Sequence, residues 1–420
     1  MSDPVFDIAV IGAGPAGLSA AKKAAQGGLT VIVLEEHAKV GEPVHCGECL
    51  SAFATKRMGL ELPEEVVALH VKGIRVVFPD NSSIIFREEG YDLEKHLFEQ
   101  YLAVLAQGAG AQLHTSSRVV GMKRENGVWT LSTLGGEVRA RAVIDASGFQ
   151  SVASEFTGLN TEKTKTVMGA QYYMEDVPND GYIEFYLWPR LAPEGYLWII
   201  PKKGGRANVG LVTAESANAQ KYLKQFVKEK GLEGKKIIKP FGGAIPASGP
   251  LRKTYGDGLI LAGDAAGFTS PMFEGGTQLA LKSGELAALT IVRALGKNPR
   301  PMTPDINDMA SMTDEKKEAA IGEPADPLCA DGLSEYEHAW REEFPPYVKL
   351  LAGKHEMYAL GEQGLSKLAH ILPPDVTGMG AQKKALIALK ALAAFGPGKV
   401  MKIKSALDTF AYSTGEMYGW

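Results

Sequence analysis

Cysteine is scarce in this chain: among 420 residues, only Cys46, Cys49 and Cys329 carry a thiol. Three thiolates alone cannot complete a four-cysteine iron–sulfur or zinc site, so we expect no metal centre. The sequence also lacks a run of 18 apolar residues, which a membrane-spanning helix would need. Its net charge of −4 is too close to neutral for a protein that binds nucleic acid. These absences favour a cytoplasmic protein, and peripheral contact with the cytoplasmic face of a membrane stays open.

Glycine, in contrast, is abundant: 48 of the 420 residues are glycine, which is about 11%, whereas the usual share is about 7%. Gly12, Gly14 and Gly17 form a GxGxxG motif between an apolar strand and a helix, and Glu35 ends the next strand. In such a βαβ unit the glycines permit a tight turn, close approach to a pyrophosphate and contact between helix and strand. The terminal carboxylate can accept hydrogen bonds from a ribose. The pattern predicts a dinucleotide-binding site.

A second glycine-rich segment, residues 257–288, also has the pattern of strand, loop and helix. Gly263 and Asp264 follow its strand, while Gly275 and Gly276 open its helix. The amides at a helix N-terminus can face an anion or a ring rich in carbonyl groups. No second GxGxxG motif occurs in a strand-and-acid context, so we expect no separate nicotinamide domain of the disulfide-reductase type.

Three motifs in order resemble the FAD-binding fold of the p-hydroxybenzoate hydroxylase type, over about the first 300 residues. They are GAGPAG with its terminal acid, DASG after four β-rich runs, and GDAAG followed by proline and paired glycines. The resemblance implies FAD and an α/β (α+β) architecture with a Rossmann-like domain formed by residues 1–160 and 240–298. The cofactor-binding residues that it implies are Gly12, Gly14, Pro15, Ala16, Gly17, Glu35, Arg87, Asp145, Gly148, Gly263, Asp264, Gly275 and Gly276.

Residues 161–239 are rich in β-branched and aromatic residues separated by turns, which predicts an antiparallel sheet between the two parts of the FAD domain. Its aromatic cluster fits either a sheet core or a wall for an apolar ligand near the flavin. The candidate substrate-contacting residues of this sheet are Tyr182, Phe185, Trp188, Tyr196, Trp198 and Pro201.

The segment GYLWIIPKKGGRANVGL, residues 195–211, is similar to the Y-x-W-x-F-P-K…N-V-G pattern of the geranylgeranyl reductase family, with Ile200 in place of the usual Phe. PVHCGECLS and LSEYEHAWREEF resemble two further segments of that family, so the likeness extends over most of residues 6–345. It implies an FAD-dependent oxidoreductase that saturates carbon–carbon double bonds of a polyprenyl lipid, such as an archaeal ether lipid.

Reduction of an isolated alkene needs a hydride on one carbon and a proton on the other. By the resemblance, Cys46 lies near the flavin, where it either gives the proton or positions the alkene, and Glu48 either tunes this thiol or binds substrate. Cys46 and Cys49 are spaced as in a redox dithiol but lack its strand-to-helix context. Electrons must arrive from an external donor: NAD(P)H, reduced ferredoxin or another soluble carrier.

Residues 299–420 are predicted to be mainly helical. From Val376 to Leu407 the sequence has six lysines, no acid and many apolar residues. This composition is typical of a helix on an anionic membrane surface, and equally of a solvated helix packed on the core. Two other functions are consistent with the flavin motifs: a monooxygenase or halogenase of an aromatic substrate, and a membrane-associated flavoprotein that passes electrons to quinone.

Overall fold

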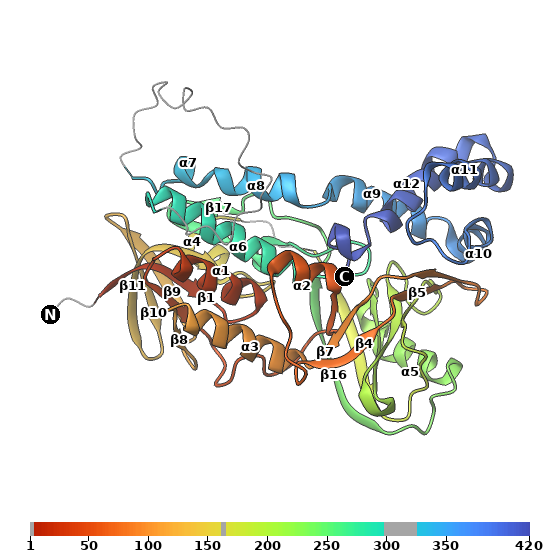
Figure 1. Ribbon diagram of the computed structural model, residues 1–420, viewed down its shortest axis with the longest axis horizontal. Helices are drawn as coiled ribbons and strands as arrows, with labels where there is room; N and C mark the ends of the chain where they lie inside the picture. Colours follow the sequence, from red (N-terminus) through yellow and green to blue (C-terminus); the bar gives the residue numbers. More distant parts are fainter. Residues whose placement is uncertain (1–3, 161–164, 298–325) are drawn as a thin grey trace.

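The computed structural model describes residues 4–160, 165–297 and 326–420. Its first sheet has eight strands in the order β17-β18-β11-β1-β2-β8, with β10 and β9 added antiparallel beside β11 (Figure 1). β1 pairs in parallel with β2 and β11, and its residues Ile8, Ala9 and Val10 are completely buried. The strands are β1 (Val5–Ile11), β2 (Val31–Leu34), β8 (Gln112–His114), β9 (Val119–Glu125), β10 (Val128–Thr133), β11 (Gly136–Asp145), β17 (Tyr255–Gly256) and β18 (Leu259–Leu261).

Three helices cover this sheet: α1 (Pro15–Gln26), α3 (Lys95–Gly108) and α6 (Thr277–Ala294), with α1 packed between the other two. Small residues allow α1 and α6 to approach closely, since a methyl group at Gly284 would lie 2.0 Å from the Ala16 carbonyl oxygen. α3 begins at Lys95, and Asp92 lies before it in β7 (Gly90–Leu93), where it pairs with neighbouring strands. This Rossmann-like part confirms the predicted fold class.

The second sheet has seven strands in the order β16-β12-β15-β14-β13-β5-β6 and is antiparallel except between β13 and β5. Residues 1–160 are predicted to belong to the FAD-binding domain, but β5 and β6 within this range extend the second sheet instead, because Ile74 and Val76 complete its core. The strands are β5 (Ile74–Val77), β6 (Ser83–Phe86), β12 (Thr166–Met174), β13 (Ile183–Tyr186), β14 (Tyr196–Pro201), β15 (Ala207–Thr213) and β16 (Ile237–Pro246).

The two faces of this sheet have different cores. Alternate residues such as Tyr186 and Leu197 pack with α5 (Ala219–Glu229), whereas Phe185 and Trp198 pack on the side of the C-terminal helices. A small sheet of β3 (Cys49–Ser51), β7 and β4 (Val67–Val71) lies beside the second sheet. The remaining helices are α2 (Ala52–Met58), α4 (Val152–Thr157), α7 (Ala330–Leu333), α8 (Glu335–Glu343), α9 (Tyr347–Tyr358), α10 (Gly361–Ile371), α11 (Ala381–Phe395) and α12 (Val400–Ala411).

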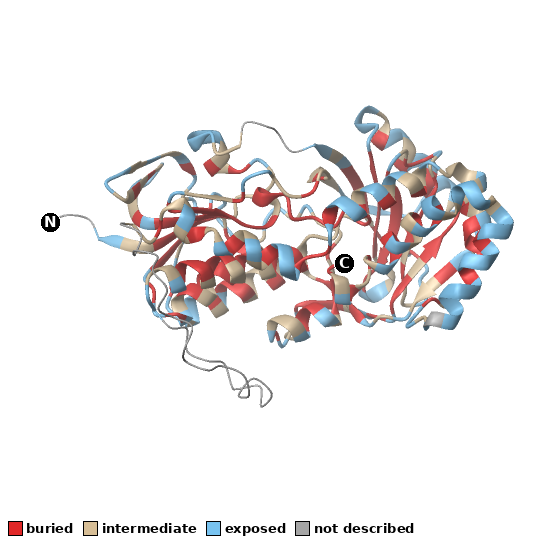
Figure 2. Ribbon diagram, turned by 90° about the horizontal axis from the view of Figure 1, so that it is seen from above, coloured by how far each residue is buried: buried red, intermediate tan, exposed pale blue. Residues whose placement is uncertain are grey.

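Residues 299–420 were predicted to be mainly helical, and the chain is helical from residue 330 onward. Residues 299–325 of this C-terminal region lie outside the described part. α8 packs on α6, and α9 packs on α12, so this region covers both the Rossmann-like part and the second sheet. Among the described residues, no helix combines the length and the apolar character that crossing a membrane requires. Figure 2 shows buried residues concentrated in the sheets and exposed ones on the outer helices.

Candidate active site

Two adjoining cavities, of about 600 and 350 Å³, lie at the carboxyl ends of β1 and β11. They share Gly14, Gly41 and Gly148 in their walls, so together they form one elongated site. The larger cavity reaches Glu35 at the end of β2, and the smaller one reaches the loop before α6 and the second sheet. This position is where parallel sheets with a GxGxxG turn bind dinucleotides.

The three glycines of the motif have three different surroundings. Gly12 has a φ of +95°, and a methyl group on it would lie 2.5 Å from the Ala146 carbonyl oxygen. A methyl group on Gly17 would lie 2.0 Å from the Gly12 carbonyl oxygen, so Gly17 sets the contact between helix and strand. Gly14 has no protein atom within 4 Å of the corresponding position, and it opens onto the cavities. Pro15 and Ala16, which begin α1, line the smaller cavity.

Glu35 lies in the wall of the larger cavity with only 9% of its surface exposed. Its Oε2 accepts a hydrogen bond from the Ala13 amide at 2.8 Å, and its Oε1 accepts one from the His37 amide at 2.9 Å. The carboxylate therefore ties the end of β2 to the glycine turn. Oε1 also lies 2.7 Å from the His37 Nδ1, whereas Oε2 keeps a lone pair, so the group can still accept a bond from a ribose hydroxyl.

Asp145 ends β11 and Gly148 lies in the loop that follows, but only Gly148 reaches the cavities. Asp145 is completely buried and uses both oxygens within its own loop. Its Oδ1 accepts bonds from Ser147, and its Oδ2 accepts bonds from the Ser151 hydroxyl and the Ala153 amide. Asp145, predicted to bind the cofactor, thus lines neither cavity; its carboxylate holds the following loop in place.

Gly263, Asp264 and Gly276 line the smaller cavity, as expected from the second glycine-rich segment. Burial raises the pKa of Asp264, and the Thr269 hydroxyl donates a hydrogen bond to its Oδ1. Gly275 lies behind the loop, where a methyl group would come within 2.8 Å of the Gly419 carbonyl oxygen. Gly276 is the residue before the first turn of α6, so the free amides of that turn are directed at the cavity.

Cys46 lines the smaller cavity, and its sulfur accepts a hydrogen bond from the Glu48 amide at 3.2 Å. Burial raises the pKa of the Cys46 thiol, which therefore stays protonated near neutral pH. Cys49 lies in β3 opposite Asp92, and burial together with the Asp92 charge raises its pKa well above the usual range. Both are free thiols in the structure.

Glu48 is buried beneath this loop rather than in the cavity wall. Its Oε2 lies 2.9 Å from the Lys202 Nζ and accepts a bond of 2.7 Å from Asn208, while its Oε1 accepts a bond from the Lys95 amide. Lys202 also donates to the Leu93 carbonyl at 2.6 Å. Glu48 therefore anchors the Cys46 loop to the second sheet and does not face a ligand.

The predicted aromatic wall divides between the two faces of the second sheet. Trp198 lines the smaller cavity, and its Nε1 donates to Gln171 at 3.0 Å. Tyr196 and Phe185 pack against Phe273 of the loop before α6, with ring centroids 5.2 and 4.5 Å away. Pro201 is buried at the end of β14. These positions place three aromatic rings next to the loop that closes the cavity.

Three predicted site residues lie elsewhere. Arg87 is exposed, forms an ion pair of 2.6 Å with Asp375 and lines neither cavity, so the structure does not bring it to the site where the cofactor was expected. Tyr182 packs beneath Arg75, near the same exposed edge. Trp188 points to the α5 side, where its Nε1 donates to the Phe78 carbonyl. The strand alternation that sends Phe185 to one face sends Trp188, three residues on, to the other.

The cavity wall also contains residues that sequence reasoning missed: His45, Lys95, Glu99, Gln171, Ile245 and Glu274. Lys95 and Glu99, one helical turn apart on α3, form a buried ion pair. Glu274 stands directly before the paired glycines, and His45 belongs to the PVHCGECLS segment, so a sequence signal was available for these two. The others come from segments without a motif.

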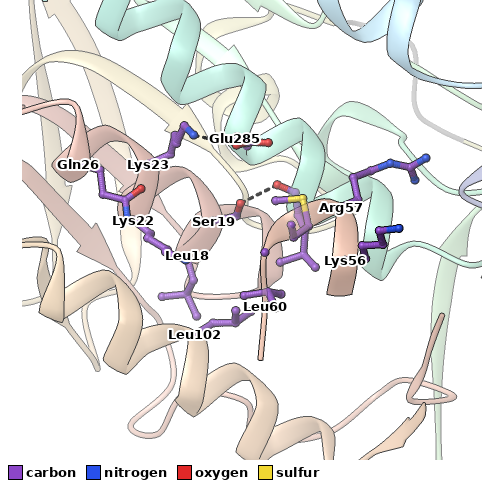
Figure 3. Close-up of a pocket in the computed structure, with 13 residues that line it drawn as sticks. Leu18, Ser19, Lys22, Lys23, Gln26, Lys56, Arg57, Leu60, Leu102 and Glu285 are labelled. Carbon is purple, nitrogen blue, oxygen red and sulfur yellow. Dashed lines mark hydrogen bonds and ion pairs between the residues drawn. The ribbon is translucent and has the colours of Figure 1, made fainter. Parts of the chain in front are cut away.

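A separate cavity of about 270 Å³ lies where α1, α2, α3 and α6 meet (Figure 3). Leu18, Leu60 and Leu102 gather at its base, while Lys56 and Arg57 point away from them. Lys23 pairs with Glu285 at 3.0 Å, and Arg57 donates to the Glu416 carbonyl. Lys23 and Arg57 thus have protein partners, and we assign no ligand to this cavity.

The elongated site fits FAD. The open face of Gly14, the adjacent N-terminus of α1 and the Glu35 carboxylate suit the pyrophosphate and the adenosine ribose. The amides at the start of α6 and the aromatic rings beside the smaller cavity suit the flavin end. When bound and reduced, FAD supplies a hydride.

Comparisons with known proteins agree with this geometry. Residues 166–245 match the geranylgeranyl reductase catalytic domain, and residues 9–177 match the pyridine nucleotide-disulphide oxidoreductase family. The chain is similar to digeranylgeranylglycerophospholipid reductase of Methanocaldococcus jannaschii, with 31% identity over 90% of this chain and 93% of that protein.

Solved structures share the architecture. A geranylgeranyl bacteriochlorophyll reductase-like protein of Thermoplasma acidophilum superposes with a TM-score of 0.79, at 27% identity, over 96% of this chain and 99% of that one. A flavin-dependent brominase has a TM-score of 0.69 at 15% identity, over 98% of this chain and all of that one, and this likeness concerns the fold alone. The chain belongs to the geranylgeranyl reductase family.

Proposed function

We propose that this protein is an FAD-dependent reductase that saturates carbon–carbon double bonds in the geranylgeranyl chains of an isoprenoid lipid. The observation that carries the proposal is one cavity whose wall unites the glycine turn of α1, the Cys46 loop, Trp198 and the loop before α6. A hydride donor held at the sheet edge would then face an alkene held against the second sheet. The relative from Methanocaldococcus jannaschii, which carries a lipid reductase name, supports this substrate class.

The chain's own residues divide the work in this proposal. Gly14, Glu35 and Asp264 hold FAD, with Gly276 at the ring. Cys46 contacts the alkene from a loop that Glu48 fixes. Trp198, together with Tyr196 and Phe185 around Phe273, forms the apolar side that orients the chain and keeps water away from it. The electrons come from an external donor, which is NAD(P)H, reduced ferredoxin or another soluble carrier.

An anaerobic turnover experiment tests the function. The protein is reduced with dithionite and mixed with digeranylgeranyl glycerophospholipid, and mass spectrometry follows the lipid. We expect the chains to gain pairs of hydrogens while the flavin absorbance returns. Cys46→Ala is expected to keep the flavin bound but to slow saturation. No mass gain, together with formation of a peroxyflavin when oxygen is admitted, would instead favour a monooxygenase or halogenase.

We also propose that α11 lies on a membrane that contains the substrate. Ile387 and Ala391 of α11 face the protein, whereas Leu386, Leu389 and Leu392, spaced three residues apart, are 53%, 65% and 42% exposed. Exposed lysines accompany these leucines: Lys383, Lys384 and Lys390 on α11, and Lys399, Lys402 and Lys404 beyond it. α11 lies at the end of the molecule opposite the first sheet (Figures 1 and 2). An outward apolar face with basic neighbours suits an anionic lipid surface.

Vesicle sedimentation tests this contact. We expect binding to vesicles of phosphatidylglycerol, weaker binding to phosphatidylcholine, and weakening by salt, because lysines attract anionic head groups. Leu389→Glu should lower the affinity about tenfold, since it places a charge where a leucine would enter the interface. The control is Val104→Glu, which changes a residue of α3 that is 64% exposed. Equal losses in the two variants, or binding to neither lipid, would contradict the proposal.

A further inference from the structure

Glu274 is a buried carboxylate in the wall of the smaller cavity. Its side chain is 2% exposed, and its Oε1 lies 2.7 Å from the Nζ of Lys354 on α9. Its Oε2 is buried without a hydrogen-bond partner among the described residues. An unsatisfied buried carboxylate oxygen is costly, so this atom calls for a proton, a water molecule or a ligand group. The backbone of Glu274 has a φ of +46°, a conformation that is uncommon for a residue with a side chain.

The groups around Glu274 come from two elements. Lys354 and Tyr358 stand four residues apart on α9, and the Tyr358 hydroxyl is also buried without a partner among the described residues. Tyr196 of β14 donates its hydroxyl to the Phe273 carbonyl at 2.6 Å. Burial and the Glu274 charge raise the pKa of both tyrosines, and Glu194 adds to the effect on Tyr358. Burial raises the pKa of Glu274 itself, against the opposing charge and hydrogen bond of Lys354 and the nearby Tyr196 hydroxyl, whose proton is directed at the Phe273 carbonyl.

Other acidic groups in the cavity wall already have fixed partners. Glu99 is paired with Lys95, and Asp264 accepts a bond from Thr269 and faces the site of the cofactor. Glu274 alone combines an unused oxygen with a cation that is itself 12% exposed, so it has a connection to solvent through Lys354.

We propose that Glu274 holds the proton that is added to the alkene and that Lys354 resupplies it from solvent. This inference rests on the proposed function. Bound and reduced FAD would supply the hydride for one alkene carbon. The Glu274 O–H bond breaks, and its proton forms the new C–H bond on the other carbon as the π bond is lost. The Glu274 carboxylate then takes a proton from the Lys354 ammonium, which regains one from water. The net consumption is one hydride and one solvent proton per double bond.

The substitutions Glu274→Gln and Lys354→Met test this assignment. Glu274→Gln keeps the shape but cannot release a proton, so single-turnover oxidation of the reduced flavin by lipid should slow by about 10² or more. Lys354→Met removes the charge that lowers the Glu274 pKa. In this variant the single-turnover rate should therefore begin to fall at a higher pH than in the native protein. Glu356→Gln is the control, since Glu356 is also on α9 but pairs with Lys402 at the surface.

A second readout does not depend on turnover. Infrared difference spectra between the native protein and Glu274→Gln, recorded over a pH series, should reveal one protonated carboxyl that persists above pH 5, and Lys354→Met should extend it to higher pH. Absence of this protonated carboxyl signal would overturn the assignment. So would a slowing of single-turnover flavin oxidation in Glu274→Gln that is no larger than the slowing in Glu356→Gln. If the native protein reduces no prenyl lipid, the proposed function fails, whereas the infrared titration still reports on Glu274.

Discussion

Replacement of Gly17 by alanine is expected to destabilise the protein by about 2–3 kcal/mol and to abolish FAD binding under dilute conditions. The added methyl group would lie 2.0 Å from the Gly12 carbonyl oxygen and 3.1 Å from a methyl carbon of Val10. Both atoms belong to β1 and its turn, which cannot move without disturbing the parallel pairing of β1 with β2 and β11. The helix must therefore separate from the strand, and the cradle for the pyrophosphate is lost with it.

Gly14→Ala is the matched comparison, because it changes the same motif in the opposite environment. Gly14 has a φ of −78° and no protein atom near the new methyl position, so alanine fits the apoprotein. We expect its stability to stay within about 0.5 kcal/mol of the native value, whereas FAD affinity falls because the methyl group enters the cavity. Urea unfolding of the apoprotein and a flavin-fluorescence titration measure the two quantities. Equal stability losses in the two variants would contradict this division of roles.

The parts of the site whose positions follow from the geometry of a parallel sheet were predictable from sequence. The glycine turn, Glu35 at the end of β2, and Gly263 with Asp264 after β18 each occupy the place that a parallel sheet gives to them. The antiparallel sheet was predictable from its composition and turns. These features depend on local geometry, so a single chain is enough to find them.

The features that depend on distant contacts were not predictable. β5 and β6 precede α3 in the chain, yet their pairing with β13 places them in the second sheet. Arg87 follows β6 and is therefore carried to the outer edge, where Asp375 neutralises it. The pairing of Glu274 with Lys354 joins residues 80 positions apart, and although Glu274 stands directly before the paired glycines, no motif marks Lys354. Strand alternation could have separated Trp188 from Phe185, but only once the register of β13 was known.

Replacement of Lys202 by methionine should have the largest effect on stability, a loss of about 3–5 kcal/mol. The Lys202 side chain is 2% exposed, its Nζ lies 2.9 Å from Glu48 and 3.8 Å from Asp92, and both carboxylates are buried. Methionine conserves most of the volume, so the loss reports the carboxylates left without a cation. Lys203→Met is the control, because Lys203 is exposed and should change stability by less than about 0.5 kcal/mol.

The pH dependence of the stability loss in Lys202→Met distinguishes an effect of charge from an effect of packing. Burial raises the pKa of Asp92, and Lys202 opposes that shift, so the pKa rises further in Lys202→Met. The folded variant then keeps a proton that the unfolded chain loses above about pH 4, and its stability falls as the pH rises. The pKa of Asp92 is raised in the native protein too, so the deficit of Lys202→Met should grow with rising pH only across the interval between the two folded-state pKa values of Asp92, which urea unfolding over a series from pH 5 to about pH 9 would reveal. A deficit that is constant over this range would mean that Lys202 acts by packing, and that the Cys46 loop is held by shape rather than by its buried charges.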